Sequence, residues 1–134
     1  MSLIRVMING SKGLMGQESV KAIIEDQELD LVAQIDLGES LSDTIRQTQA
    51  QVVVDFTTAA VVMENAVAII ESGARPVIGT SGLLPEQVSN LQKLCKKHDN
   101  GGVIVPNFAV GAVLMMKYAQ DAAKYFPNVE VIEL

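Results

Sequence analysis

The sequence lacks the features that several large classes of protein require. Its 134 residues include one cysteine, Cys95, which excludes an intramolecular disulfide and any multi-cysteine metal site. No apolar run reaches the ~18 residues of a membrane-spanning helix. Basic residues are also few, because 10 Lys and Arg stand against 16 Asp and Glu and leave a formal net charge of −6. Such a surface argues against partners that are nucleic acids or anionic membranes.

The N-terminus opens directly into an apolar run and carries no signal peptide, so we expect a cytoplasmic protein. Residue types that act directly on a substrate are sparse as well. The only histidine, His98, falls at a predicted helix end among charged residues, and we interpret it as solvated. The loop serines and threonines lack a histidine partner, so serine-nucleophile chemistry is unsupported. Asp55 lies in an apolar strand, where we expect it to accept backbone donors. We therefore predict no catalytic residue and no metal site in this chain.

The most informative stretch that is present covers residues 3–16. An apolar run over 3–8 ends in glycines at 10, 13 and 16, and a helical pattern follows at once. This order of strand, glycine-rich turn and helix predicts a loop that approaches a diphosphate with its backbone, at the positive end of a helix. The spacing departs from the usual G-x-G-x-x-G, since Lys12 stands where a second glycine is usual. A tight turn without a ligand is the alternative.

An acidic residue downstream favours the binding interpretation. Asp36 follows the apolar strand predicted over 29–35 and lies 20 residues after Gly16. A carboxylate at the end of the second strand accepts hydrogen bonds from the 2′- and 3′-hydroxyls of a ribose and repels a 2′-phosphate. A solvated loop aspartate is the alternative interpretation of Asp36 alone.

Strand and helix patterns alternate along the whole chain. We predict a single domain over residues 1–134, an α/β fold with a doubly wound parallel sheet of the Rossmann-like, NAD(P)-binding type. The expected caps are Ser42-Asp43 for the second helix and Thr57-Thr58 for the third. The predicted strands cover 3–8, 29–35, 52–56, 76–79, 103–105 and 129–134, and the predicted helices cover 15–27, 42–50, 59–72, 85–98 and 112–125.

The loops with glycine, hydroxyl or acidic residues all leave predicted strands at the same end. They cover 10–16, 36–37, 56–58, 79–82 and 106–108. Because the carboxyl ends of parallel strands share one edge of a sheet, we expect these loops to converge on one crevice that holds a dinucleotide.

Four of these motifs occur together in an order that resembles one known family. They are Gly10-Ser11-Lys12-Gly13-Leu14-Met15-Gly16, Val54-Asp55-Phe56-Thr57, Gly79-Thr80-Ser81-Gly82-Leu83 and Asn107-Phe108-Ala109-Val110-Gly111. In this order they resemble the N-terminal, nucleotide-binding domain of dihydrodipicolinate reductase, also called 4-hydroxy-tetrahydrodipicolinate reductase. The resemblance extends over essentially the whole chain. It implies a reductase of the diaminopimelate route to lysine, which transfers a hydride from NADH or NADPH to a cyclic, unsaturated dicarboxylate and yields tetrahydrodipicolinate.

The resemblance also assigns roles to individual residues. It implies that the loop holds the diphosphate through Gly10, Ser11, Lys12, Gly13, Leu14 and Met15, and that Asp36 binds the adenosine ribose. Phe56 and Thr57 would lie along the cofactor. The nicotinamide end would meet Gly79, Thr80 and Ser81, with Ser81 also close to the substrate, and its pocket would be lined by Pro106, Asn107 and Phe108.

The chain departs from the family in two ways. Many relatives carry arginine after the ribose acid and a basic residue in the phosphate loop, where this chain has Leu37 and Leu14. We therefore expect a preference for NADH with residual NADPH binding, since the Lys12 ammonium could still reach a 2′-phosphate.

The second departure is that the printed chain ends at Leu134. In the family, a segment with two adjacent histidines, a lysine and a Ser-Gly-Thr turn follows, together with a C-terminal domain for substrate binding and tetramerisation. We expect the 134 residues alone to be inactive and the full-length protein to be a homotetramer. The nucleotide domain of another Rossmann oxidoreductase and a free-standing NAD-binding regulatory domain remain alternatives. An apolar strand over 129–134 would leave an exposed edge, so we expect the isolated chain to self-associate or to be unstable.

Overall fold

The computed structural model describes residues 2–126, 128, 130 and 132, and it contains the predicted alternation of strands and helices. Each described element lies within a few residues of its predicted range, whereas most of the strand predicted over 129–134 falls outside the described residues. The elements are β1 (Ile4–Asn9), α1 (Leu14–Glu25), β2 (Leu29–Ile35), α2 (Leu41–Thr48), β3 (Val52–Asp55), α3 (Val62–Glu71), β4 (Arg75–Ile78), α4 (Pro85–Lys97), β5 (Val103–Ile104) and α5 (Val110–Ala122).

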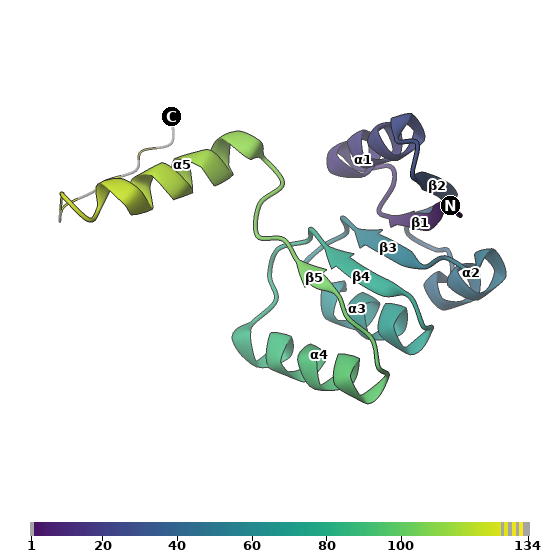
Figure 1. Ribbon diagram of the computed structural model, residues 1–134. Helices are drawn as coiled ribbons and strands as arrows, with labels where there is room; N and C mark the ends of the chain where they lie inside the picture. The colour runs from purple at the N-terminus through teal and green to yellow at the C-terminus, as the bar shows by residue number, and fades with distance from the viewer. Residues whose placement is uncertain (1, 127, 129, 131, 133–134) are drawn as a thin grey trace.

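The five strands form one parallel sheet in the order β2-β1-β3-β4-β5 (Figure 1). The chain moves outward from β1 to β2, then crosses back over β1 to place β3 on its other side. This reversal between β1 and β3 is the topological switch point, next to which ligands of doubly wound sheets bind. The predicted fold class is confirmed.

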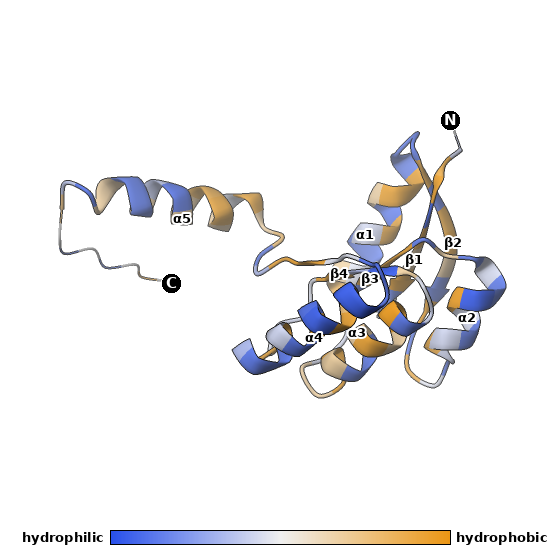
Figure 2. Ribbon diagram, turned by 60° about the horizontal axis from the view of Figure 1, so that its bottom comes forward, coloured by the Kyte–Doolittle hydropathy of each residue, from blue (hydrophilic) through white to orange (hydrophobic). Residues whose placement is uncertain are grey.

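Helices cover both faces of the sheet, with α1 on one face and α2, α3 and α4 on the other (Figure 1). The larger core lies under α3, where Met7, Val53 and Ile69 have no exposed surface. A smaller cluster under α1 contains Val6, Ile8 and Ile23. Figure 2 shows hydrophobic residues concentrated in the strands and in α3, whereas α4 is largely hydrophilic. The strands are β-branched on both faces because each face is at least partly covered.

Two predicted helix caps are wrong. Helix α2 is capped by Ser40, whose hydroxyl accepts a hydrogen bond from the Asp43 amide at 3.4 Å, and not by Ser42-Asp43. Helix α3 starts at Val62 without a side-chain cap, three residues after the predicted start. The Thr57 hydroxyl that was expected to cap it donates instead to the Asp55 carboxylate at 2.8 Å.

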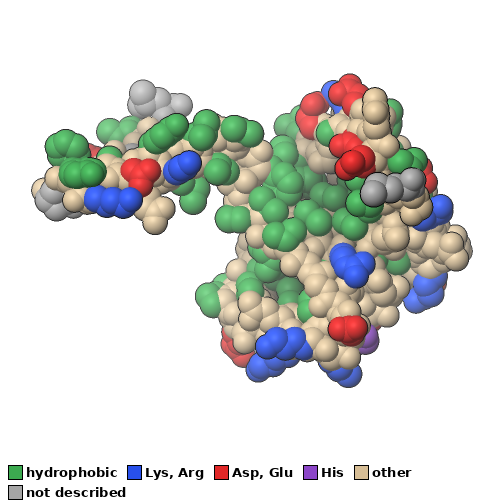
Figure 3. All heavy atoms as spheres, viewed as in Figure 1, with side chains coloured by type: hydrophobic (Ala, Val, Ile, Leu, Met, Phe, Trp, Pro, Cys, Tyr) green, Lys and Arg blue, Asp and Glu red, His purple; other side chains and the backbone are tan. Residues whose placement is uncertain are grey.

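Helix α5 extends away from the rest of the molecule and none of its residues is buried (Figure 1). Figure 3 shows hydrophobic side chains along α5 and on the neighbouring part of the body below α1. Within the part of the chain that the structure describes, no helix combines the length and the apolar character needed to cross a bilayer.

Candidate functional site

A crevice of about 510 Å³ lies at the carboxyl edge of the sheet, beside the switch point between β1 and β3. Three loops from the predicted set meet there: the loop after β1, the loop after β2 and the loop after β3. Its lining residues are Asn9, Gly10, Gly13, Asp36, Leu37, Gly38, Glu39, Leu41, Phe56, Thr57, Thr58, Val61 and Asn65.

The loop after β1 is fixed by its own hydrogen bonds. The amides of Gly10 and Ser11 both donate to the Ile35 carbonyl, at 3.0 and 3.1 Å. The Gln17 side chain donates to the Lys12 carbonyl at 2.7 Å. Gly10 has a φ of +85°, and a Cβ there would collide with the Phe56 carbonyl. The Gly10 and Ser11 amides, which the family resemblance assigns to the diphosphate, are therefore already used within the protein. Their hydrogen bonds hold the loop in one conformation without a ligand.

The first turn of α1 offers the amides that remain free. Among the described residues, the amides of Leu14 and Met15 donate to no backbone carbonyl or side chain outside the helix, as expected for the start of a helix. No acidic side chain lies in this turn and the N-cap residue, Gly13, makes no side-chain cap. The positive end of the helix dipole therefore has no counter-charge from its own first turn, and Gly13 at this end lines the crevice, which suits an anion.

Asp36 is held at the adjacent edge of the crevice by the same loop. One carboxylate oxygen accepts from the Lys12 amide at 2.9 Å and the other accepts from the Leu37 amide at 2.8 Å. These backbone N–H groups, Leu37 first and then Lys12, lower the pKa of the Asp36 carboxyl, and the Lys12 ammonium adds to the effect. Asp36 thus carries its negative charge in a fixed position next to the loop.

Glu39 is a second carboxylate at this edge, and sequence reasoning missed it. Its side chain accepts from the Asp36 amide at 2.8 Å, and both residues line the crevice. Between them Leu37 is 98% exposed, so no packing requires an apolar side chain there. The edge is therefore acidic, which disfavours a ligand with an additional phosphate at this point.

An aromatic pair joins the loops after β3, β4 and β5. The rings of Phe56 and Phe108 meet edge to face with centroids 4.9 Å apart. Gly79 lies against both rings, and a Cβ on it would collide with Phe56. This contact brings the predicted loop over 79–82 and the predicted loop over 106–108 to the crevice through Phe56.

Several predicted site residues do not line the crevice. Ser11 and Thr80 are buried, and the Thr80 hydroxyl points inward to Asp55 at 2.6 Å. Ser81 is exposed, and the Asn107 side chain accepts from the Ala109 amide at 2.8 Å. Neither these two residues nor Pro106 lines the crevice.

His98, Cys95 and potential metal ligands, for which the sequence predicts no role in catalysis or metal binding, are also placed by the structure. His98 is the exposed C-cap residue of α4. Cys95 is half-buried and packs against the core as a small hydrophobic residue. In residues 2–126, 128, 130 and 132, no group of three or more His, Cys, Asp or Glu side chains is arranged to hold a metal ion.

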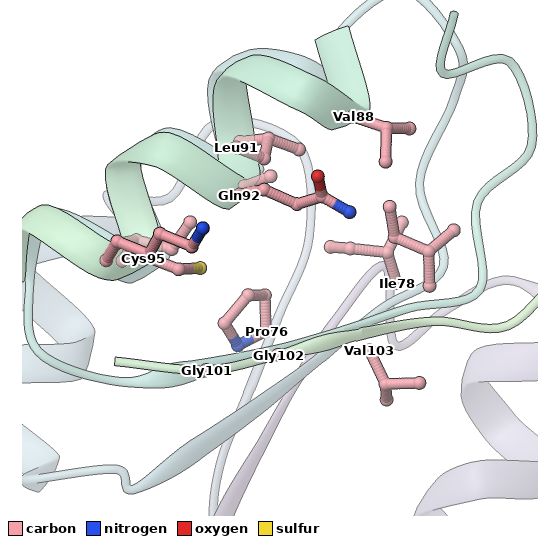
Figure 4. Close-up of a pocket in the computed structure, with 13 residues that line it drawn as sticks. Pro76, Ile78, Val88, Leu91, Gln92, Cys95, Gly101, Gly102 and Val103 are labelled. Carbon is pink, nitrogen blue, oxygen red and sulfur yellow. The ribbon is translucent and has the colours of Figure 1, made fainter. Parts of the chain in front are cut away.

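A second cavity of about 670 Å³ lies between α4 and strands β4 and β5. Figure 4 shows Val88, Leu91 and Cys95 of α4 facing Pro76 and Ile78 across it. Its lining is mainly apolar and contains no aspartate, glutamate or glycine-rich helix start. It is therefore less suited than the crevice to a charged ligand.

Known proteins are similar to this chain over nearly its full length. A family model described as "Dihydrodipicolinate reductase, N-terminus" matches residues 4–108. The 4-hydroxy-tetrahydrodipicolinate reductase of Coxiella burnetii is 51% identical over 131 residues, which are 98% of this chain and 55% of the relative. The enzyme of the same name from Streptococcus pneumoniae is 46% identical over 142 residues, with 98% and 56% covered.

A solved structure gives the same comparison in three dimensions. The dipicolinate-bound dihydrodipicolinate reductase from Paenisporosarcina sp. TG-14 superposes with a TM-score of 0.83 at 34% identity, over 96% of this chain and 56% of that one. The chain thus spans about half the length of the proteins that it matches.

Proposed function

Because the chain belongs to the dihydrodipicolinate reductase family, matching its N-terminal region, we propose that it is the nicotinamide-dinucleotide-binding domain of a 4-hydroxy-tetrahydrodipicolinate reductase. In this proposal the whole protein reduces 4-hydroxy-tetrahydrodipicolinate to tetrahydrodipicolinate in the biosynthesis of diaminopimelate and lysine. The observation that carries it is the convergence in one crevice of Gly13, the N-cap residue at the positive end of α1, and the fixed Asp36 carboxylate.

The residues present fit a dinucleotide. Gly13 is the N-cap of α1, and a Cβ built on it would meet only the Gly10 carbonyl, at 3.5 Å. The protein's own packing therefore leaves room for a Cβ at residue 13, and close approach of a diphosphate explains why glycine is there. Leu14 and Met15 would bind the diphosphate through their amides, and Asp36 would bind the adenosine ribose.

The nicotinamide supplies the hydride when the cofactor is bound. The chain's own contribution is to orient it: the Phe56 and Phe108 rings and the Gly79 backbone form the surface at the other end of the crevice. Ser81 is exposed at this end and is our candidate for contact with the substrate. The 134 residues contain no histidine near the crevice to act as a general acid, so we expect them to bind the cofactor without turnover.

We propose that NADH is preferred over NADPH. Asp36 and Glu39 place two carboxylates where a 2′-phosphate would enter, and the exposed Leu37 offers no positive charge there. The Lys12 ammonium stands close enough to affect Asp36 electrostatically, which leaves a route to residual NADPH binding.

Calorimetric titration of the chain with NADH and NADPH tests the cofactor site and its selectivity. We expect NADH to bind more tightly, and Leu37→Arg to raise the ratio of NADPH to NADH affinity about tenfold through a charge-assisted bond to the phosphate. Glu39→Gln should raise the same ratio about threefold to fivefold by removing one repulsion.

Glu86→Gln, an exposed acid on α4 far from the crevice, is the matched control and should leave the ratio unchanged. If the folded chain binds neither NADH nor NADPH, the proposal of a cofactor site in this crevice is wrong. Binding with no change of ratio in Leu37→Arg would overturn only the account of selectivity.

The homotetramer and the cytoplasmic location that the family resemblance implies stay predictions. The net charge of −6 supports the expectation that neither nucleic acid nor an anionic membrane is a partner. Analytical ultracentrifugation of the full-length protein tests the tetramer.

A further inference from the structure

A buried cluster of polar side chains lies directly beneath the crevice, centred on Asp55 at the end of β3. Asp55 has no exposed surface. One of its carboxylate oxygens accepts from the hydroxyls of Thr57 and Thr80, at 2.8 and 2.6 Å, and from the Thr57 amide at 3.2 Å. The other accepts from the side-chain amides of Asn9 and Asn65, at 2.8 and 2.9 Å. Each carboxylate oxygen thus accepts at least two hydrogen bonds.

These donors come from four different parts of the fold. Asn9 ends β1, Thr57 is in the loop after β3, Asn65 is in α3 and Thr80 is in the loop after β4. The Thr80 hydroxyl also accepts from the Thr57 amide at 2.8 Å, and Asn65 donates to the Thr57 hydroxyl at 3.1 Å. The cluster therefore ties the carboxyl ends of β1, β3 and β4 to one another, around one carboxylate.

A buried carboxylate is a costly way to hold a strand end if stability is the only need. Among the described residues no Lys, Arg or His forms an ion pair with Asp55, so neutral donors alone offset its burial. Apolar residues in place of both Asp55 and its donors would suit the buried face of β3 without this cost. What the carboxylate adds is a fixed arrangement of several loops at once.

Two of the cluster's donors belong to loops at one half of the crevice. Thr57 and Thr80 stand in the loops next to the Phe56–Phe108 pair, while Asp36, at the ribose end, is held separately by Lys12 and Leu37. We propose that Asp55 is a positioning residue, which holds the loops after β3 and β4 against the nicotinamide half of the cofactor and leaves the adenosine half unaffected. This inference rests on the proposed function.

The test compares two ligands, ADP for the adenosine half and NADH for the whole cofactor, by calorimetric titration of the 134-residue chain. Thr80→Val keeps the shape of the side chain and removes the hydroxyl that joins the loop after β4 to Asp55 and to the Thr57 amide. We expect it to weaken NADH binding about tenfold and to change ADP binding by less than about twofold. Thr80→Ser restores the hydroxyl and should restore NADH binding.

Thr48→Val is the matched control. Its hydroxyl donates to the Thr44 carbonyl within α2 at 2.6 Å, away from the crevice, so both affinities should stay at the wild-type level. Asp55→Asn is a second variant, in which the side-chain NH2 must face N–H donors, either those of Asn9 and Asn65 or that of the Thr57 backbone. We expect it to lose more NADH affinity than Thr80→Val, with a lower melting temperature.

Two results would overturn the positioning role. They are unchanged NADH affinity in folded Thr80→Val, and an equal loss of ADP and NADH affinity, which marks a merely structural effect. Absence of binding of both ligands to the folded wild-type chain would instead overturn the proposed function, and this inference with it.

Discussion

At the scale of single residues, the glycines between β1 and α1 meet two different needs. Gly10 is required by the protein itself, because of its φ of +85° and its contact with the Phe56 carbonyl. Gly16 is required by close packing alone, since a Cβ on it would collide with the Gly10 carbonyl. Gly13 meets no such restriction. Substitutions at 10 and 13 should therefore separate folding from binding.

Gly13→Ala should leave the fold intact and abolish tight cofactor binding. Its φ of −70° suits alanine, so the melting temperature should be unchanged or slightly raised. The added methyl group lies where the diphosphate would approach, and NADH affinity should fall at least about tenfold. Gly10→Ala should destabilise the fold by about 1–3 kcal/mol. Thermal unfolding and calorimetry measure both, and normal NADH affinity in Gly13→Ala would refute this assignment.

The lowered pKa of the Asp36 carboxyl predicts how ribose binding depends on pH. Hydrogen bonds from the Leu37 and Lys12 amides lower its pKa in the folded chain, so it stays charged below the ordinary carboxyl range of about 3.9. The stability that comes from this shift is present above the unfolded-state pKa and is lost as the pH falls through the lower, folded-state pKa. NAD⁺ affinity should therefore stay constant from about pH 8 to about pH 5, because Asp36 stays ionised and the diphosphate of NAD⁺ has no terminal phosphate group that titrates there.

Titrations of NAD⁺ across this pH range, with Asp36→Asn as the control, test the prediction. The variant should bind more weakly at every pH. A wild-type affinity that declines steadily between neutral and mildly acidic pH would show that a different group governs binding.

The sequence indicates some site residues well and others hardly at all. Gly10, Gly13 and Asp36 are found because their spacing along the chain follows from the strand-loop-helix order. Asn9 and Asn65 escape notice because their role is a hydrogen bond to Asp55, 46 and 10 residues away in sequence, which no local pattern specifies. Glu39 could have been found, since it lies three residues after Asp36 on the same loop.

At the scale of elements, the presence of a helix or strand is easier to predict than the residue at which it starts. Strand β2 matches its predicted range because an apolar run between polar residues defines both ends. The starts of α2 and α3 differ from prediction because each helix has two hydroxyl residues near its start, Ser40 and Ser42 at α2 and Thr57 and Thr58 before α3, and the sequence does not show which of them caps. In α3 the competing contact is Asp55, which takes the Thr57 hydroxyl.

Helix α5 and one face of the sheet expose large apolar side chains to solvent. Leu114 is 43% and Met116 is 54% exposed, although both are large and hydrophobic. On the sheet face that carries α1, Val54 and Val77 are only half-buried and Val103 is exposed. Surface of this kind promotes association.

The isolated chain should therefore self-associate, and α5 should contribute. Replacing both Leu114 and Met116 by glutamine, which keeps helix propensity, should shift the chain toward monomer. Ile24→Gln, on α1 and with a side chain that is 65% exposed, is the control of equal chemistry and should not. Sedimentation equilibrium measures the change. A wild-type chain that is monomeric at every concentration would contradict the role of this surface.

At the scale of the whole molecule, the sheet order determines where the crevice lies. Alternating strands and helices predict a parallel sheet, and a parallel sheet places every strand-end loop at one edge. The alternation does not fix which loops are neighbours, because that depends on the order β2-β1-β3-β4-β5. This order explains why the loops after β1, β2 and β3 line the crevice, whereas the loops after β4 and β5 reach it through Phe56 and Phe108.

The central claim is that this crevice, and not the larger cavity beside α4, binds the dinucleotide. Titration of the ¹⁵N-labelled chain with NADH, followed through its amide chemical shifts, tests it most directly. We predict that shifts concentrate at Gly13, Leu14 and Met15 and in the segments 36–39 and 56–58. Shifts confined to α4 and β5, or no shifts in a folded chain, would contradict the account.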